Sequence, residues 1–458
     1  MNKKLKFIDL FAGLGGIRIG FEQACEERGI ETECVLTSEI KPYAIEAYKH
    51  NFSDDNLYGD ISKVDENTIP DFDVLFAGFP CQPFSSAGTR GGFMDTRGTL
   101  FFDIERILKA KKPSAFLLEN VEGLVSHDRE NKNDKIGRTL ETILKILGEI
   151  GYSVTWKVLD SQYFGVPQAR KRIYIVGHLD SEVSLDDFPQ KKTILANILL
   201  SNQALMQTDF TKRLLEHFEP YQLHGKSIKD KRGGDNNIHS WDIEVKGETS
   251  TQQRVLLRNL LRQRRRKHWA EKKGMTWMDG MPLTLEEIKT FYTPDNLFES
   301  ADLQSLLDDL VEKGYLVYEH PKDLVTVVDE DGNQRHVRQY AEHIEKGYNI
   351  VVGKLSFEIT KILDPQDVTP TLVATDVTRL AVVDGEGLRR LTVREGLRLF
   401  GYPENYELTV SYQDAFDLLG NTVVVPVIDQ ISQRILQSMF NLEQTPKVDV
   451  QPVQYTLI

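Results

Sequence analysis

The chain has 458 residues, and at roughly 150 residues per domain this length indicates two to three domains. With 40% hydrophobic and 27% charged residues, the composition is that of a soluble globular protein and excludes the fibrous and disordered classes. No apolar run approaches the ~18 residues that would span a bilayer, so we expect no membrane segment. Three cysteines without metal-ligand spacing indicate a reducing compartment, the cytoplasm, and no metal site.

The charges are unevenly distributed along the chain. A net charge of −13 argues against a uniformly basic nucleic-acid binder. However, residues 226–268 contain 12 Lys or Arg against 5 Asp or Glu, whereas residues 299–331 contain 2 against 10. A basic stretch in an acidic chain predicts one local surface that attracts phosphates, and we expect the acidic stretch to face away from them.

The first 180 residues alternate between short β-rich runs and helical patterns. The expected strands are residues 6–11, 33–39, 56–60, 73–79, 115–120, 153–159 and 172–177. The expected helices between them are residues 16–29, 42–50, 100–111 and 139–151. This alternation predicts an α/β fold with a doubly wound, mostly parallel sheet that helices cover on both faces. Ligands of such sheets bind beyond the carboxyl ends of the strands.

The regular alternation ends near residue 185 and resumes near residue 388. The stretch between mixes helical patterns with short strands and polar turns; the helical patterns are 251–270 and 301–313, and the strands are 315–318 and 324–328. We therefore expect a first domain over residues 1–185 and an inserted mixed α+β domain over residues 186–387. Residues 388–458, with a helix over 392–400 and a turn at Gly420, would return to the first domain.

The opening strand ends in a glycine-rich turn, Phe11-Ala12-Gly13-Leu14-Gly15-Gly16, that leads into a helix. Glycines let the backbone turn sharply beside unpaired helix amides, where a ligand can approach closely, although many such turns serve only strand-to-helix packing. Glu39 and Asp60 end the next two strands, where the ribose hydroxyls and purine amino group of a nucleoside would bind. Both acids could instead be ordinary helix caps.

Cys81 follows the fourth strand and is bracketed by Pro80 and Pro83, which would hold the loop in an extended course. Most lone cysteines are small buried hydrophobic residues. A thiol at the strand rim beside a nucleotide-like site is instead placed to be a nucleophile, although no nearby His presents itself as its base.

Further charged residues follow the next strands. Glu119-Asn120-Val121 brings a carboxylate to the same rim as Cys81. Gln168, Arg170 and Arg172 alternate, so they point to one side of an extended segment, where two guanidiniums could hold an oxygen-rich ligand. The same alternation is also typical of a solvated strand edge.

Taken in order, five segments resemble the motifs of the cytosine-C5 DNA methyltransferases of bacterial restriction-modification systems. They are Phe11–Gly16, Gly78-Phe79-Pro80-Cys81-Gln82, Glu119-Asn120-Val121, Gln168-x-Arg170-x-Arg172 and Gly420-Asn421-Thr422-Val423. The resemblance covers residues 5–180 and 388–435, and the ordered set is very specific. The inserted segment corresponds to the family's target-recognition domain, where Thr371-Leu372 is similar to a Thr-Leu pair.

The resemblance implies methyl transfer from S-adenosylmethionine to carbon 5 of a cytosine flipped out of a specific duplex DNA sequence, with S-adenosylhomocysteine as product. Cys81 would add to carbon 6 of the ring. Glu119 would hold N3, while Arg172 with Arg170 would serve O2 and the flanking phosphate. The carbonyl of Phe79 or Pro80 is a candidate acceptor for the cytosine amino group, and no residue is identified as the base for the carbon 5 proton.

The resemblance also implies which residues bind the methyl donor, most of them in the segments already described. They are Phe11, Ala12, Gly13, Leu14, Gly15, Gly16, Glu39, Ile40, Asp60, Ile61, Gly78, Pro80, Leu100, Asn421 and Val423. Phe11 would stack near the adenine, and Asn421 could equally be a turn residue.

Four arginines of the basic stretch are spaced by four, four and three residues. If residues 251–270 form one helix, Arg254, Arg258, Arg262 and Arg265 make one stripe. Such a stripe can bind phosphates and read guanine edges, although a solvated helix face is the ordinary alternative. We also expect Gln82, Ser85 and Gln168 to contact DNA.

Two other functions are compatible with the motifs. One is an RNA methyltransferase of the related transfer-RNA group, against which the long inserted domain with its arginines favours duplex DNA. The other is a catalytically silent DNA-binding or donor-binding protein, against which the intact Cys81 and Glu119 speak. The resemblance implies a monomer in the bacterial cytosol that acts on double-stranded DNA, alongside a cognate restriction endonuclease that works independently.

Overall fold

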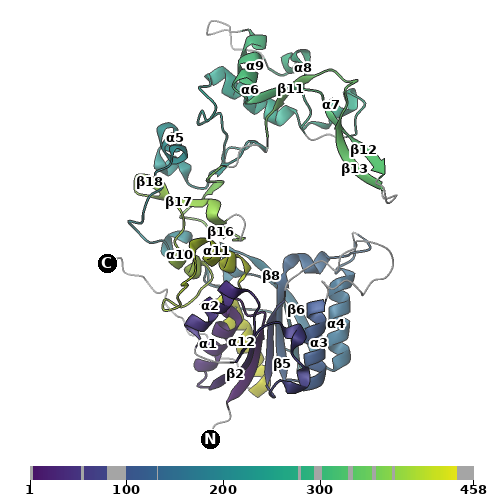
Figure 1. Cartoon of the computed structure of the whole chain (residues 1–458), viewed down its shortest axis with the longest axis vertical. Helices are drawn as coiled ribbons and strands as arrows, with labels where there is room; N and C mark the ends of the chain where they lie inside the picture. Colours follow the sequence, from purple (N-terminus) through teal and green to yellow (C-terminus); the bar gives the residue numbers. More distant parts are fainter. Residues whose placement is uncertain are drawn as a thin grey trace. The chain divides into compact units, whose positions relative to one another are not determined.

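The computed structural model describes residues 4–52, 56–79, 99–131, 133–276, 280–292, 302–328, 334–352, 357–373 and 377–440 (Figure 1). The chain divides into two compact units. The first unit contains residues 1–201, 365–378 and 391–458, and the second contains residues 202–364 and 379–390. The first unit therefore extends past residue 185, and it takes a short segment, 365–378, from the stretch that the sequence pattern assigns to the insertion.

A seven-stranded sheet organises the first unit (Figure 1). Its order is β3-β2-β1-β4-β5-β8-β6; the first five strands run parallel, and β8 runs antiparallel to both of its neighbours. The strands are β1 (Leu5–Leu10), β2 (Thr32–Ser38), β3 (Leu57–Tyr58), β4 (Val74–Gly78), β5 (Ala115–Val121), β6 (Ser153–Asp160) and β8 (Lys171–His178). The chain order reverses between β1 and β4, which is where ligands of such sheets bind. The predicted doubly wound, mostly parallel fold is confirmed.

Helices cover both faces of this sheet (Figure 1). They are α1 (Gly16–Glu26), α2 (Pro42–Asn51), α3 (Thr99–Lys111), α4 (Arg138–Ile150) and α12 (Val425–Phe440). Two further helices of this unit, α10 (Val393–Leu399) and α11 (Tyr412–Asn421), pack against each other. Helices α3 and α4 pack together on one face, and α1 packs against α12 on the other. The α1–α12 contact is close, because a Cβ on Gly20 would lie 2.8 Å from the Val425 carbonyl oxygen. The C-terminal segment is therefore an integral layer of the first unit.

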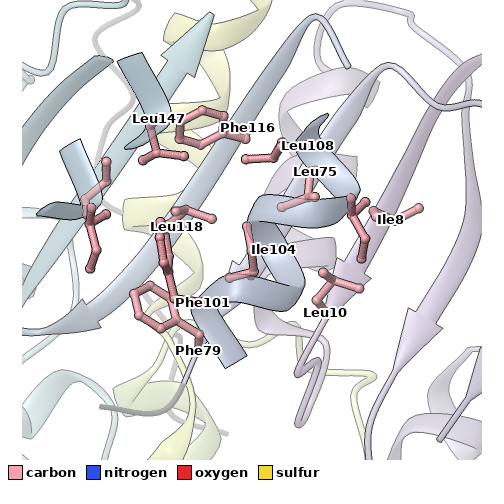
Figure 2. Packing of buried hydrophobic residues seen from close by; sticks show 14 of the residues in the cluster. Ile8, Leu10, Leu75, Phe79, Phe101, Ile104, Leu108, Phe116, Leu118 and Leu147 are labelled. Atoms are coloured by element: carbon pink, nitrogen blue, oxygen red, sulfur yellow. The ribbon is translucent and has the colours of Figure 1, made fainter. Parts of the chain in front are cut away.

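The sequence alternation of the central strands divides their side chains between the two helical layers. Ile8 and Leu10 of β1 and Leu75 of β4 pack with Ile104 and Leu108 of α3 in the core that Figure 2 shows. The intervening residues point to the other face. There Phe7 and Phe76 meet Phe21 of α1, with ring centroids 4.7 to 5.8 Å apart. Burial on both faces explains why these strands are continuously apolar.

The return of residues 365–378 adds a small parallel pair to the first unit, in which β16 (Thr369–Pro370) lies beside β7 (Gln168–Ala169). In the C-terminal segment, Gly420 lies inside the last turn of α11 rather than in the turn that the sequence pattern predicts. The apolar segment after it forms α12.

The second unit contains short sheets and helices around two hydrophobic cores. Its helices are α5 (Asp209–His217), α6 (Thr251–Gln263), α7 (Lys267–Lys272), α8 (Leu285–Lys289) and α9 (Leu303–Glu312). A five-stranded sheet has the order β10 (Asn237–Ile238), β9 (Ser227–Ile228), β15 (Lys361–Ile362), β17 (Leu380–Asp384) and β18 (Gly387–Arg389). Two antiparallel pairs are formed by β11 (Leu316–Glu319) with β14 (Gly347–Ile350), and by β12 (Lys322–Val328) with β13 (Gln334–Tyr340). The predicted mixture of helices and strands is confirmed.

The single helix expected over residues 251–270 is wrong, because the chain leaves the helical course between α6 and α7. Arg264 stands at this break and is buried. Its guanidinium donates to the Asn349 side-chain oxygen at 2.8 Å and to the Ile350 carbonyl at 3.2 Å. These bonds to β14 hold the end of α6 in place, and a contact so distant in sequence leaves no mark on the local helical pattern.

No helix among the described residues is long and apolar enough to cross a membrane.

Candidate active site

A cavity of about 490 Å³ lies at the carboxyl ends of β1, β2, β4 and β5 in the first unit. Its lining joins the glycine-rich turn, the residues that follow each of these strands, the Arg170–Arg172 segment and the end of α11. The residues are Phe11, Ala12, Gly13, Gly16, Ile17, Ser38, Glu39, Ile40, Lys41, Ala44, Asp60, Ile61, Gly78, Phe79, Leu100, Glu119, Asn120, Val121, Arg170, Arg172, Leu418, Gly420, Asn421, Thr422 and Val423. Segments more than 400 residues apart in sequence thus meet around one cavity at the switch point of the sheet.

Glu39 fixes the conformation of the glycine-rich turn. Its carboxylate accepts hydrogen bonds from the backbone N–H groups of Gly13 at 2.8 Å, Ile40 at 2.7 Å and Lys41 at 2.9 Å. A carboxylate has about four acceptor positions, so about one remains for a hydroxyl in the cavity. Phe11 adopts a φ of 57°, a left-handed conformation that costs of order 1–3 kcal/mol in a non-glycine residue. The hydrogen bond from Gly13 helps to hold the turn in which Phe11 faces the cavity.

Gly16 is needed because the C-terminal segment approaches the turn closely. A Cβ at this position would lie 2.7 Å from the Tyr402 hydroxyl and 2.9 Å from the Val423 side chain. Leu14 and Gly15 do not line the cavity. Leu14 is fully buried, and a Cβ on Gly15 would strike the ring of Phe52. Both residues pack within the first unit, and their contact with the cofactor stays a prediction.

Asp60 combines the two roles that the sequence leaves open. It caps the 3₁₀ helix Ile61–Lys63, accepting from the Ser62 backbone N–H at 3.1 Å, and it lines the cavity. Its hydrogen bonds with Ser62, together with Lys63, hold the pKa of this carboxyl below its usual value. It therefore presents a charged acceptor to the cavity.

Glu119 and Arg172 form a buried ion pair on the cavity wall. Arg172 Nε lies 3.1 Å from Glu119 Oε1, across the antiparallel pairing of β5 with β8. Burial raises the pKa of Glu119, and the charges of Arg172 and Arg170 only partly oppose this shift. A carboxyl with a raised pKa can carry a proton and donate it in a hydrogen bond.

Arg170 connects three separate segments. Its guanidinium donates to the carbonyl oxygens of Leu372 at 3.1 Å, Gly420 at 3.2 Å and Thr422 at 2.7 Å. Burial lowers the pKa of Arg170 to about 10, so the side chain stays charged at neutral pH. The side chain lines the cavity, but these bonds make it primarily a positioning residue for the C-terminal segment.

Gln168 is fully buried, which corrects the expectation that it contacts DNA. Its amide nitrogen donates to the Leu399 carbonyl at 3.0 Å, and its side-chain oxygen accepts from the Leu372 N–H at 3.2 Å. Strand alternation correctly places Gln168 on the same side as Arg170. It cannot reveal that residues 371–373 and α10 cover that side.

Asn120, which sequence reasoning does not single out, orders the start of the segment that leads to Cys81. Its side chain donates to the Phe79 carbonyl at 2.9 Å and accepts from the Val121 N–H at 2.8 Å. The Phe79 carbonyl, a candidate acceptor for the cytosine amino group, is thus oriented by the strand that carries Glu119. The residues Pro80, Cys81, Gln82 and Ser85, for which the sequence predicts cofactor-binding, catalytic and DNA-binding roles, lie outside the described residues.

Other cavity residues also lie outside the predicted set. They are Ile17, Ser38, Lys41, Ala44, Asn120, Val121, Leu418, Gly420 and Thr422. Asn120, Val121, Gly420 and Thr422 lie within the motif segments and could have been found there. Lys41 gives no local signal, because its partner is Asp417 on α11, at 3.2 Å.

Three of the four arginines of the expected stripe, Arg258, Arg262 and Arg265, lie around one hollow of the second unit, and Arg254 does not line it. Arg254 is tied to Glu244 at 2.7 Å, and Arg258 lies 3.0 Å from the buried Asp242. Arg262 is exposed at the end of α6, whereas Arg265 lies beyond the helix. Ion pairing therefore satisfies Arg254 and Arg258 within the second unit.

The residues of the cavity suit a nucleoside-type cofactor such as S-adenosylmethionine. The volume lies within the range of about 300–1,000 Å³ that is usual for small-molecule sites. Phe11, Leu100 and Ile40, which is 68% exposed, offer apolar surfaces for a flat ring. Glu39 and Asp60 offer acceptors for hydroxyl and amino groups. The donor set therefore fits an adenosine moiety.

Comparisons with known proteins agree with this geometry. A family model described as C-5 cytosine-specific DNA methylase matches residues 5–437. The chain is 56% identical over 439 residues to the Type II methyltransferase M.NlaIV of Neisseria lactamica, covering 95% of this chain and all of that protein. It is 40% identical over 462 residues to the Type II methyltransferase M.HgiCI of Herpetosiphon aurantiacus, covering 95% and 98%.

Solved structures share the fold. The S. pombe Dnmt2 methyltransferase matches with a TM-score of 0.50 at 16% identity, covering 96% of this chain and 100% of that chain. The Entamoeba histolytica methyltransferase EhMeth gives a TM-score of 0.50 at 16% identity, covering 95% and 99%. With the ordered motifs around one cavity and a family match across both units, the chain belongs to the C-5 cytosine-specific DNA methylases and is a DNA (cytosine-5-)-methyltransferase.

Proposed function

We propose that this enzyme transfers a methyl group from S-adenosylmethionine to carbon 5 of a cytosine that has been flipped out of duplex DNA, through a covalent adduct with Cys81. The observation that carries the proposal is the buried Glu119–Arg172 pair, which shares its cavity with the glycine-rich turn. When a nucleophile adds to cytosine, N3 and O2 of the ring gain electron density. An acid and a cation side by side can each stabilise one of these two atoms.

Cys81 is the nucleophile of the proposal. Carbon 5 of cytosine is a weak nucleophile until a thiolate adds to carbon 6 and makes the ring an enamine. The other two cysteines are buried, and burial raises the pKa of Cys25 to about 12, which disfavours its thiolate. Once carbon 5 carries the methyl group, loss of its proton expels the Cys81 sulfur from carbon 6 and restores the aromatic ring.

Glu119 would act in its protonated form. Addition at carbon 6 increases electron density on N3 and O2. Glu119 donates a hydrogen bond to N3 and stabilises this density, and Arg172 does the same at O2. Their mutual contact of 3.1 Å keeps both groups in place before the base arrives. Arg170 holds the carbonyls of the C-terminal segment and thereby shapes the cavity.

The methyl donor supplies an electrophilic methyl group on a sulfonium when it is bound. Phe11, Ile40 and Leu100 would pack against its adenine, Glu39 would accept from the ribose hydroxyls, and Asp60 from the adenine amino group. Asn421 and Val423, which line the same cavity, would complete the site from the C-terminal segment.

Carbon 6 lies inside the stacked duplex, so the target nucleotide must leave the helix before Cys81 can reach it. We propose that the second unit is the target-recognition domain, and that Gln82 and Ser85 contact the DNA around the flipped base. The names of the relatives place the reaction in a Type II restriction-modification system. The enzyme would act as a monomer in the bacterial cytosol, independently of its endonuclease.

Tritiated donor offered with duplex DNA tests the proposal. Label on carbon 5 of cytosine, located at one sequence by bisulfite sequencing, is expected. The same enzyme offered transfer RNA under matched conditions should give little label. Label on transfer RNA instead of DNA would assign the substrate to the alternative group, and no label on either would favour a catalytically silent protein.

A further inference from the structure

A second hollow, of about 620 Å³, lies within the second unit. It is bounded by residues 232–239 on one side and by the C-terminal half of α6 on the other. Four arginines line it, Arg232, Arg258, Arg262 and Arg265, whereas Asp235 is the only carboxylate among the described lining residues. The hollow is therefore basic, in a chain whose net charge is −13.

The wall opposite α6 is held rigidly. The Asn237 side chain donates to the carbonyls of Arg232 at 3.2 Å and Gly233 at 2.8 Å, which closes the loop. His239 is buried, bonds to Asp242 at 3.0 Å and stacks on Trp241 with ring centroids 4.5 Å apart. Gly234 has a φ of 140°, which a residue with a side chain rarely adopts. The loop therefore keeps its shape without a ligand.

Two of the four arginines make no ion pair among the described residues. Arg258 bonds to Asp242. Burial works against the charged form of Asp242, but bonds from His239 and the charges of His239 and Arg258 outweigh it, so the pKa of Asp242 is lowered. Arg232 and Arg262 are exposed, and neither makes an ion pair with another residue in the described part of the chain. Both line the hollow, Arg232 from the loop and Arg262 from the C-terminal end of α6.

We propose that this hollow binds a phosphate group of the DNA backbone through Arg232 and Arg262, an inference that rests on duplex DNA being the substrate. Arginine favours two groups in DNA, the guanine edge and the backbone phosphate, and the concave shape of the hollow distinguishes between them. A guanine edge lies at the floor of a groove and must be reached by a projecting side chain. A backbone phosphate projects outward and can enter a concave site.

A phosphate contact of this kind sets affinity and register but carries no sequence information. The hollow thus gives a role to two arginines of the basic stretch, Arg232 and Arg262, that make no ion pair among the described residues. Arg254 and Arg258, by contrast, support the fold through Glu244 and Asp242.

The salt dependence of DNA binding tests this assignment. Affinity for a short duplex is measured without methyl donor over a series of salt concentrations, for the full chain and for Arg232→Ala, Arg262→Ala and the double variant. Each lost phosphate contact should make the slope of log K against log salt shallower by about 0.9, and the double variant by about 1.8. Arg262→Lys should keep most of the slope, because it keeps the charge.

Arg254→Ala is the matched control, since it removes one arginine of α6 that is already tied to Glu244. Its slope should equal that of the unaltered enzyme, and thermal unfolding of every variant shows whether it is folded. An unchanged slope in the folded double variant would overturn the proposal. So would a loss of preference for the methylated sequence over a scrambled duplex at unchanged slope, which would assign the arginines to base reading. Because the assay needs no methyl transfer, an enzyme that binds as predicted but does not methylate cytosine would contradict the proposed function alone.

Discussion

The two units hold their charged residues in opposite ways. In the first unit, Glu119, Arg172 and Arg170 lie against the cavity, and each is matched by a charge or by carbonyl oxygens. In the second unit, Arg232 and Arg262 are exposed around a hollow and have no such match among the described residues. Buried, matched charges keep one geometry, which the chemistry of a single base requires. Exposed, unmatched charges instead suit a polyanion that must bind and dissociate.

The largest effect is expected where the proposed nucleophile is removed. Cys81→Ser should lower methyl transfer by about 10⁴-fold or more, because the hydroxyl is a far weaker nucleophile than a thiolate. DNA affinity at fixed salt should stay close to that of the unaltered enzyme, because the contacts of the second unit are untouched. A parallel loss of affinity and activity would contradict a purely chemical role for this sulfur.

Removing the acid of the buried pair should come next. Glu119→Gln should lower kcat by about 10²- to 10³-fold and leave the Kd of the methyl donor unchanged, since an amide cannot supply a proton to N3. The exposed Glu122→Gln, three residues away, is the control and should behave like the unaltered enzyme. A weaker donor Kd with unchanged kcat would move Glu119 out of the chemical step.

The same pair predicts a pH dependence. Burial raises the pKa of Glu119, so the protonated form that the mechanism requires persists above the usual range of a carboxyl. In the unaltered enzyme kcat should fall as pH rises through this raised pKa, once the Cys81 thiolate is accounted for. The falling limb should be absent in Glu119→Gln, and its persistence there would assign it to another group.

Substitution of Arg170 tests whether this buried cation stabilises the fold through the carbonyl oxygens that it binds. Arg170→Ala leaves the carbonyls of Leu372, Gly420 and Thr422 without their donor and opens a cavity, so unfolding should be easier by about 3 kcal/mol. Arg138→Ala, which removes an exposed arginine of the same unit, should leave the Tm unchanged. Equal Tm values for the two variants would show that Arg170 does not hold the C-terminal segment.

Asp429 on α12 is a half-buried carboxylate of the first unit that makes no ion pair among the described residues, and it should give the smallest effect. Burial, followed by the charge of Glu27, raises its pKa to about 6. Because the folded state binds the proton more tightly than the unfolded state, stability is lost as pH rises from about 4 to 6. Asp429→Asn should therefore stabilise the protein by about 1–2 kcal/mol at pH 8 and not at pH 4. The exposed Asp71→Asn should change neither value, and a gain that is independent of pH would contradict the account.

The sequence predicts those parts of the fold and site that depend on local patterns. Continuous apolar runs identify the central strands. Because ligands of such sheets bind beyond the carboxyl ends of the strands, the sequence also predicts that Glu119, Glu39 and Asp60 lie at one cavity. The sequence pattern cannot predict contacts between residues that are far apart in the chain. The buried state of Gln168 depends on Leu372 and Leu399, and the end of α6 depends on bonds from Arg264 to β14. The sequence pattern likewise does not show that two members of the arginine stripe, Arg254 and Arg258, form ion pairs with Glu244 and Asp242.

Formation of the sulfur–carbon bond is the most direct test of the central claim. A duplex that carries 5-fluorocytosine at the methylated position, incubated with enzyme and methyl donor, cannot lose the fluorine and should trap the adduct. We predict a protein–DNA complex that survives denaturing electrophoresis and whose cross-linked peptide contains Cys81, with none formed by Cys81→Ser. No stable complex with an enzyme that methylates ordinary cytosine, or a complex of equal yield with Cys81→Ser, would contradict the account.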